Sequence, residues 1–289
     1  MTTTVFDLAD VMLTAVSHAS DFIKSFKDSL HVEKKDDGSL VTQVDEQCQK
    51  HMFSTILHEY PTLNIIGEEK AVGGLPERDL PHIIKHTYPT DNREIAISDL
   101  VVYVDPLDGT DCFVKKQYEC VCVLLGITYK GKPFMGIVSQ PFNGNKIIIS
   151  FDNHVQCYPE ETLKALQSTD NKDFTFVCSQ RNDVKDKITS FPEKYNIVYK
   201  GGSGAKMVML VRGEGDIYIH PLVQSCTWDT LAVQVILEAL GGKVCDINGK
   251  DLLYPTDKEK GMRHLNGVVC LSQRATKYLD WVVGLKLQI

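Results

Sequence analysis

Apolar residues recur every three or four positions at the start of the chain. The repeat runs from Phe6 to Leu30 and predicts a long amphipathic helix, with Thr4 and Asp7 as a capping pair in its first turn. A second helix is predicted over residues 42–60, where a following proline would end it. The chain therefore begins with two helices that each have one face to bury.

Short apolar runs in the middle of the chain predict strands. They cover residues 63–66, 101–104, 121–128 and 134–140. A glycine turn joins the last two runs as a hairpin. The polar, weakly periodic residues 70–98 predict a surface insertion. Within it, His82 and His86 have the spacing of a helix face, but flanking prolines favour a surface pair.

Helices and strands are predicted to alternate in the second half of the chain. The predicted strands are 174–178, 197–199, 216–219 and 268–271, and the predicted helices are 184–190, 203–212, 227–240 and 275–287. This alternation indicates a layered α/β protein. We expect a single domain with two closely packed halves, 1–156 and 157–289, and a soft boundary near residues 153–161.

Charge and cysteine content narrow the classes of function. Thirty-one basic and 38 acidic side chains give a formal net charge of −7. This argues against binding of nucleic-acid polymers or anionic membranes, and at first sight against a phosphate-bearing substrate. The nine cysteines show no C-x-x-C spacing and predict buried thiols in a reducing compartment. With neither a secretory start nor an apolar run long enough to span a bilayer, the predicted location is cytoplasmic.

The sharpest local feature is the sequence Asp-Pro-Leu-Asp-Gly-Thr at residues 105–110. Asp105 and Asp108 follow an apolar strand, where open α/β sheets place ligands. The two carboxylates can converge on one cation, with the Leu107 carbonyl as a further oxygen ligand. A set of oxygen ligands favours a hard cation such as Mg²⁺ over zinc. By itself, the same run is equally compatible with an ordinary solvent-facing turn.

Three other acids strengthen this interpretation. Asp45 and Asp229 each lie in a predicted first helical turn, and Glu68 follows a strand. Each has a simple structural explanation: Asp45 and Asp229 would complement a helix dipole, and Glu68 with Glu69 would be a solvated charge pair. Their joint occurrence at element ends is harder to explain by chance. Residues 201–206 are rich in glycine but lack the spacing of a P-loop, so a glycine turn before a helix is the simpler interpretation.

These motifs together resemble a known family. Gly67-Glu68-Glu69, the run at 105–110, Trp228-Asp229 and the Gly-Gly pair at 241–242 resemble the magnesium-dependent, lithium-sensitive phosphatases of the inositol monophosphatase superfamily. The resemblance implies an α/β (α+β) fold, a layered αβαβα sandwich. Within the superfamily, Leu107 and the 201–206 segment are most similar to the 3′(2′),5′-bisphosphate nucleotidases. Residues 216–219 are also similar to inositol polyphosphate 1-phosphatases.

The resemblance implies roles for individual residues. Glu68, Asp105 and the Leu107 carbonyl would hold one Mg²⁺. Asp105, Asp108 and Asp229 would hold a second, and Asp45 with Glu68 a weaker third. Thr110, bonded to Asp45, would orient the attacking water. The substrate contacts would come from Gly109, Thr110, Ser203, Lys206 and His220. Li⁺ would be an inhibitor.

Two positions depart from the nucleotidase pattern. Asp111 stands where these enzymes often carry lysine, and Asn182 or Arg181 replaces a histidine that often lies over the base. The predicted activity is removal of the 3′-phosphate from adenosine 3′,5′-bisphosphate, a small-molecule substrate. The alternatives are an inositol 1,4-bisphosphate 1-phosphatase, a catalytically silent metal- or nucleotide-sensing relative, and a structural α/β interaction domain. If divalent ions gather at the five acids, they reverse the local sign of charge, and a phosphate ester is then acceptable.

Overall fold

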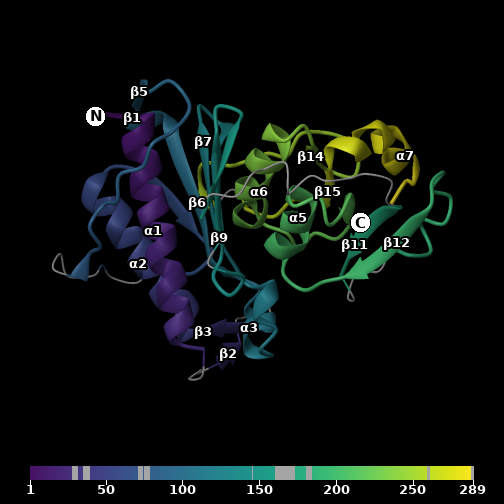
Figure 1. Ribbon diagram of the computed structural model, residues 1–289, viewed down its shortest axis with the longest axis horizontal. Helices are drawn as coiled ribbons and strands as arrows, with labels where there is room; N and C mark the ends of the chain where they lie inside the picture. The colour runs from purple at the N-terminus through teal and green to yellow at the C-terminus, as the bar shows by residue number, and fades with distance from the viewer. Residues whose placement is uncertain are drawn as a thin grey trace.

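The computed structural model describes residues 1–27, 32–34, 40–70, 74, 79–144, 146–159, 173–179, 184–258 and 261–287; for 32–34, 40 and 41 it describes the backbone alone. These residues form five layers, helix, sheet, helix, sheet, helix (Figure 1). The predicted αβαβα sandwich is confirmed.

The outer helical layer contains α1 (Val5–Ser25) and α2 (Gln43–Glu59). It covers one face of a six-stranded sheet with the order β10-β9-β8-β7-β6-β4. These strands are β4 (Asn64–Gly67), β6 (Leu100–Asp108), β7 (Cys122–Tyr129), β8 (Lys132–Gln140), β9 (Lys146–Phe151) and β10 (His154–Tyr158). The pairing is antiparallel except between β4 and β6, which run parallel.

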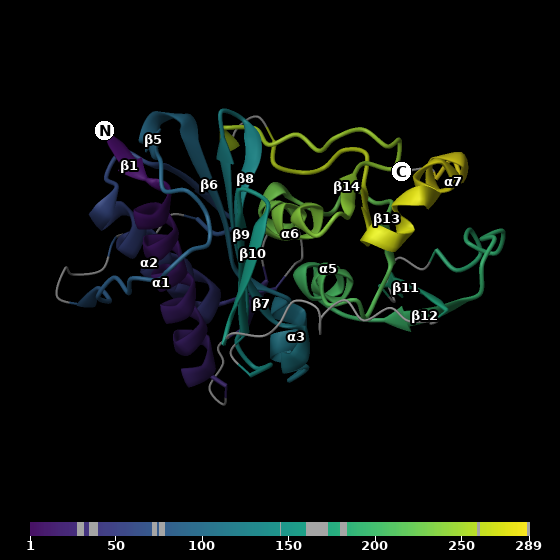
Figure 2. The ribbon, with the colours of Figure 1, turned by 45° about the horizontal axis from the view of Figure 1, so that its top comes forward.

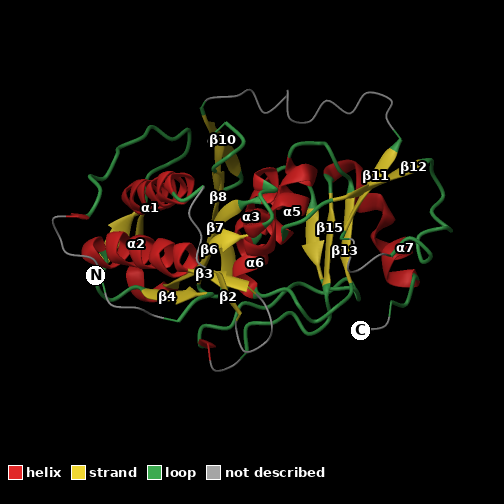
Figure 3. Ribbon diagram, turned by 90° about the horizontal axis from the view of Figure 1, so that it is seen from below, coloured by secondary structure: helices red, strands yellow, loops and turns green. Residues whose placement is uncertain are grey.

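The central helices α5 (Ser203–Val211) and α6 (Thr227–Ala239) separate this sheet from a five-stranded one, β12-β11-β13-β15-β14 (Figure 2). Its strands are β11 (Phe174–Cys178), β12 (Tyr195–Tyr199), β13 (Ile217–His220), β14 (Lys243–Cys245) and β15 (Val268–Leu271). The last layer is a 3₁₀ helix, η5 (Gln273–Tyr278), followed by α7 (Leu279–Gly284). Figure 3 shows helices on both sides of each sheet.

Several shorter elements flank or connect the main layers. Two small pairs are β1 (Thr2–Thr4) with β5 (Glu94–Ala96) and β2 (Val32–Lys34) with β3 (Leu40–Thr42). The 3₁₀ turn η2 (Ile97–Asp99) leads into β6. The short helices α3 (Thr110–Val114) and η3 (Tyr118–Cys120) connect β6 to β7.

Close packing of α6 on the six-stranded sheet depends on a glycine. A Cβ at Gly136 of β8 would lie 2.1 Å from the Ala232 carbonyl oxygen, which is closer than any side chain allows. The approach buries Leu231 and Val233 between the layers. It also determines how far the N-terminus of α6 lies from the sheet.

The segment predicted as a surface insertion is instead part of the fold. Residues 94–96 form β5 against β1, and the buried Tyr88 donates a 2.8 Å hydrogen bond to Asp10 of α1. His82 is exposed as expected, whereas His86 is half-buried and lies 3.2 Å from the same carboxylate. The prediction failed because an irregular segment leaves no periodic pattern, although it packs against a helix.

Other sequence predictions need correction at element ends. The capping of α1 by Thr4 is confirmed, but the helix ends at Ser25, because the Phe26 N–H bonds back to Ile23 and leaves the helical pattern. Residues 184–190 form hydrogen-bonded turns instead of a helix, with the Val184 carbonyl accepting from positions 187 and 188. The predicted closing helix is shorter and begins as the 3₁₀ turn η5.

Within the two large sheets, three strands were missed because they are short or close behind a turn: β9, β10 and β14. The strands of the two small pairs, β1 with β5 and β2 with β3, were also not predicted. The expected division at 156/157 falls inside β10, and the two-half organisation stays a prediction. All nine cysteines are buried and free, which confirms buried thiols. Among the described residues, no helix combines the length and apolarity needed to cross a membrane.

Candidate active site

An irregularity in β6 brings its two acids to one side. In a regular strand, residues three apart point to opposite faces. Against β7, Asp105 pairs with Leu124 but Asp108 pairs with Cys122, so β6 carries one extra residue between them. Such a bulge re-aims side chains. Asp105 and Asp108 therefore both face the same cleft, as the sequence run predicted.

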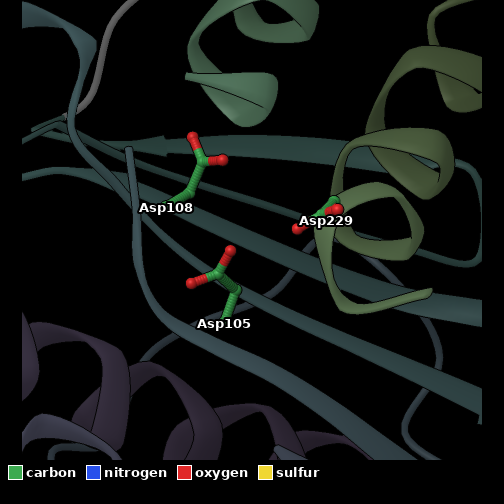
Figure 4. A group of neighbouring side chains, drawn as sticks. All are labelled: Asp105, Asp108 and Asp229. Carbon is green, nitrogen blue, oxygen red and sulfur yellow. The ribbon is translucent and has the colours of Figure 1, made fainter. Parts of the chain in front are cut away.

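Asp229 completes a three-carboxylate cluster from the opposite side. It is the third residue of α6, where its Oδ2 accepts a 2.6 Å hydrogen bond from the Cys226 N–H. Oxygen atoms of Asp105, Asp108 and Asp229 all lie within 4.8 Å of one another (Figure 4). Residues more than one hundred positions apart are thus joined by the packing of α6 on β6 and β7.

Glu68 lies beside this cluster because β4 and β6 run parallel. Gly67 pairs with Val104, and the Glu68 N–H donates to the Val104 carbonyl at 3.1 Å, which extends the ladder to the residue just before Asp105. The Nζ of Lys258 contacts the same segment, donating to the carbonyls of Gly67, Glu68 and Glu69 at 2.5, 3.2 and 3.3 Å. Lys258 was missed by sequence reasoning, since a lysine in a loop carries no distinctive pattern.

Asp45 and Thr110 form a hydrogen-bonded pair behind the cluster. Asp45 is the third residue of α2, and its Oδ2 accepts from the N–H and hydroxyl of Thr42 in a capping box. Its Oδ1 accepts a 2.8 Å hydrogen bond from the Thr110 hydroxyl, which also lies 3.2 Å from the Leu107 carbonyl. Asp45 does not line the cleft itself, whereas its hydrogen-bond partner Thr110 does.

Burial and mutual repulsion make this region costly for charged carboxylates. Burial raises the pKa of Asp45 to about 6, against the opposing effect of its hydrogen bonds. Burial and, as a smaller effect, the negative charge of Glu68 raise the pKa of Asp105 well above its usual value. The same two effects raise the pKa of Asp229. Burial likewise raises the pKa of Asp108, although Lys206 opposes the shift. Clustered, desolvated acids of this kind are typical of functional sites and of cation sites.

The cleft is about 790 Å³ in volume. Its lining contains every predicted site residue except Asp45. These lining residues are Glu68, Asp105, Leu107, Asp108, Gly109, Thr110, Ser203, Lys206, His220 and Asp229. Beyond the acids, the lining includes Lys115, Tyr199 and Lys200, which the sequence analysis did not single out. Asp111, the departure from the nucleotidase pattern, is bonded to Lys115 at 2.7 Å. Arg181 and Asn182 lie outside the described residues.

Two predicted substrate residues have other contacts in the structure. The N–H groups of Ser203 and Gly204 donate to Asp108 at 3.0 and 2.9 Å, so the start of α5 holds an acid of the cluster. The buried Lys206 donates to the Gly202 carbonyl at 2.7 Å, and its ammonium lies over the ring of Tyr218. Both residues still line the cleft.

His220, at the end of β13, is a buried neutral group. Burial, followed by the charge of Lys206, lowers the pKa of His220 to about 4. It therefore offers the cleft a hydrogen-bonding imidazole without charge at neutral pH.

Buried acids at the ends of two strands and at the N-terminus of α6 form a candidate cation site in a layered α/β protein. A model of the inositol monophosphatase family matches residues 5–277, and the chain belongs to this family. It is 27% identical to 3′(2′),5′-bisphosphate nucleotidase 1 of Dictyostelium discoideum, with 99% of both chains covered. It is 31% identical to the protein of that name from Rattus norvegicus, covering 83% of this chain and 81% of the relative.

Solved structures support the fold. An inositol monophosphatase/NADP phosphatase complexed with Mg²⁺ and phosphate superposes with a TM-score of 0.69 at 18% identity, covering 96% of this chain and 94% of that one. A staphylococcal inositol monophosphatase bound to 2′-AMP gives 0.67 at 19% identity, covering 97% and 98%. The family match and the named relatives, together with this fold, make the protein a phosphatase of the inositol monophosphatase family.

Proposed function

We propose that the protein is a Mg²⁺-dependent phosphatase that hydrolyses the 3′-phosphate of adenosine 3′,5′-bisphosphate to give AMP and phosphate. The observation that carries the proposal is the Thr110–Asp45 hydrogen bond beside the carboxylate cluster. The substrate is supported by relatives at 27–31% identity that are named as bisphosphate nucleotidases.

The residues fit a hard divalent cation. The ligand atoms offered are oxygens alone, from Asp105, Asp108, Asp229 and Glu68, together with the carbonyl of Leu107. Such a set selects Mg²⁺ over softer metals. Bound there, the metal would supply positive charge for the phosphoryl oxygens and a more acidic water. A neighbour with this fold was solved with Mg²⁺ and phosphate, which supports the choice of ion.

The chain's own residues prepare the attacking water and the phosphate. Because the Thr110 hydroxyl gives its hydrogen to Asp45, its oxygen is free to accept a hydrogen bond from a water in the cleft. The pKa of Asp45, raised by burial, suits a group that takes up a proton near neutral pH. The N–H groups at Gly109 and Thr110 are assigned to the phosphate. Gly109 adopts φ 88°, a conformation that favours glycine.

The remainder of a bisphosphate nucleotide needs positive charge and an aromatic or apolar surface. Lys200 and Lys115 lie on the cleft lining, together with the exposed ring of Tyr199. We assign the second phosphate to this lysine-bearing side and the base to the aromatic ring, with Ser203, Lys206 and His220 as further contacts. The lysines also account for anion binding by a chain with a net charge of −7.

The structure weakens the support for an inositol 1,4-bisphosphate 1-phosphatase. The similarity at residues 216–219 includes Asp216, which is bonded to Arg274 and to the N–H of Thr175 and does not line the cleft. A structural role therefore explains Asp216, whereas Tyr218 of the same segment lines the cleft. A catalytically silent relative is disfavoured because Asp45 and Thr110 are both present and bonded.

The test is phosphate release by the purified protein, with and without Mg²⁺, from adenosine 3′,5′-bisphosphate and from inositol 1,4-bisphosphate. The nucleotide should give the higher kcat/KM, and Asp105→Asn should abolish turnover. Asp99→Asn, which alters an acid paired with Lys130 away from the cleft, is the matched control. Full turnover by Asp105→Asn would exclude the proposed metal site. Binding without turnover of either substrate would favour the silent relative.

Three further properties are part of the proposal. We infer inhibition by Li⁺ from the family resemblance. Cytoplasmic location is supported by nine buried, free cysteines. Action on small molecules, without nucleic-acid polymers or membranes as partners, is supported by the acidic composition.

A further inference from the structure

Two cysteines that the proposed reaction does not use line the same cleft. Cys112 lies in α3 and Cys120 ends η3, and each side chain is 4% exposed. Two backbone hydrogen bonds make the segment between them a turn. The Gln117 N–H donates to the Cys112 carbonyl at 2.8 Å, and the Cys120 N–H donates to the Gln117 carbonyl at 3.0 Å. This turn holds the two cysteines side by side.

The two sulfurs converge on the backbone of Gly201. A Cβ at Gly201 would lie 2.2 Å from Cys112 Sγ and 3.7 Å from Cys120 Sγ, so only a residue without a side chain fits there. The thiols also interact with each other. A pair of adjacent thiols at the wall of an open cleft can be reached by small reagents, unlike thiols in a sheet interior.

Their surroundings give the two sulfurs different chemistry. The hydrogen bond from Cys112, the positive charge of Lys200 and the Gly201 N–H lower the pKa of Cys120, against the opposing effects of burial and of the neighbouring Glu119 carboxylate. The same thiol–thiol interaction, together with burial, raises the pKa of Cys112. Cys120 is therefore the better nucleophile, and Cys112 can act as the resolving thiol.

We propose that Cys112 and Cys120 form a reversible disulfide that switches the phosphatase off, with a low-molecular-weight disulfide as the oxidant. The Cys120 thiolate attacks one sulfur of the reagent, forms a mixed disulfide and releases the first small thiolate. The Cys112 sulfur then attacks the Cys120 sulfur and releases the second small thiolate, which takes up the proton from Cys112. Two protein thiols are oxidised, and the small disulfide is reduced to two thiols.

The link would act on the active site through the Cys120 backbone. The Cys120 carbonyl oxygen would be 2.7 Å from a Cβ at Gly109 and 2.4 Å from one at Gly202, so it is packed against both glycines. Gly109 precedes Thr110, and the residues after Gly202 hold Asp108. A disulfide bond is about 2.05 Å long. Formation of the disulfide would bring the two sulfurs to that distance and move α3 relative to η3. Because Thr110 is the first residue of α3, it would move as well.

The experiment treats the reduced full-length protein with oxidised glutathione and measures three quantities. Peptide mass mapping should show the Cys112–Cys120 link, and thiol titration should show two of the nine thiols lost. Phosphate release should fall roughly ten- to a hundredfold, the scale expected when a catalytic group moves by about 1 Å. Dithiothreitol should restore it. The effect on turnover rests on the proposed function, whereas the link is detected by mass without any substrate.

Single-cysteine variants distinguish oxidation of this pair from oxidation of other thiols. Cys120→Ala should remain active after glutathione treatment, whereas Cys112→Ser should stop at the mixed disulfide and carry one bound glutathione on Cys120. Cys157→Ser, at a cysteine of similar exposure (7%) on β10, should stay sensitive and is the control. Loss of activity in Cys120→Ala would overturn the proposal. So would a link between other cysteines, nine thiols that stay free, or a linked protein with full turnover. If the link forms but no phosphate ester is hydrolysed by the reduced protein, the proposed function fails instead.

Discussion

The Thr110 hydroxyl donates a 2.8 Å hydrogen bond to Asp45 Oδ1 across 65 positions of the chain. Asp45 is anchored by Thr42 at the start of α2, and Thr110 starts α3 at the end of β6. The pair therefore links the outer helical layer to the cleft. It connects a buried proton acceptor to the surface that water can reach.

Replacing Thr110 tests this pair. Thr110→Val keeps the shape but removes the hydroxyl, so kcat should fall by about 10²–10⁴, the range of general base catalysis. Thr110→Ser retains the hydroxyl and should keep most of the turnover. Steady-state kinetics at saturating Mg²⁺ measure both, with the exposed Thr87→Val as control. Equal turnover by the valine and serine variants would contradict the proposed role.

Removal of divalent cations should make stability depend on pH. The pKa values of Asp45, Asp108 and Asp229 are raised by burial to about 6, 6 and 8. An acid whose pKa is raised by folding binds more protons in the folded state than in the unfolded state. The stability that this proton binding contributes is fully present below about pH 4 and is lost as the pH rises to about 8. In EDTA, the Tm should therefore fall between pH 5 and 8.

Mg²⁺ should remove most of that fall, because the cation replaces the protons that the carboxylates lose. Differential scanning calorimetry in EDTA and in Mg²⁺ measures the effect. The Asp105→Asn/Asp229→Asn double variant should show a smaller pH dependence in EDTA. A Tm that rises with pH in EDTA would show that these acids are not clustered as described.

Lys258 is expected to act as a positioning residue for Glu68. Its ammonium binds the carbonyls of three successive residues and lies 5.4 Å from the centre of the Trp228 ring, next to Asp229. Lys258→Met should weaken Mg²⁺ affinity by about 10- to 100-fold, the range for residues that orient metal ligands.

The Mg²⁺ dependence of Tm measures this affinity without any substrate. Activity as a function of Mg²⁺ concentration provides a second measurement, in which kcat at saturating Mg²⁺ should change less. Lys250→Met, at an exposed lysine, is the matched control. An unchanged Mg²⁺ dependence in Lys258→Met would refute the positioning role.

Gly136→Ala should destabilise the interface between α6 and the six-stranded sheet. The added methyl group would lie 2.1 Å from the Ala232 carbonyl oxygen, and overpacking of this kind costs about 1–3 kcal/mol. Urea unfolding monitored by circular dichroism measures the loss. Gly284→Ala is the control, since its Cβ would meet no atom within 4 Å. Equal stability of the two variants would contradict the close approach.

Local patterns predicted the parts of the fold that depend on neighbours in the chain. The pattern over residues 42–60 and the proline that follows located α2, because helical hydrogen bonds join residues four apart and proline cannot continue them. The Asp105–Asp108 run was recognisable for the same reason. By contrast, the β5 segment and the contact of Tyr88 with Asp10 left no local pattern, and β14 was too short to show one.

Patterns along the chain were sufficient to predict the layered fold, the five acids and Thr110 as candidates, and buried cysteines. The meeting of Asp229 with Asp105 and Asp108 became visible in the folded protein alone, because it depends on how closely α6 packs on the sheet. The tertiary structure alone placed Cys112 beside Cys120 and Lys258 beside Glu68. These contacts join side chains from separate elements, and their distances follow from packing across layers, which no pattern along the chain records.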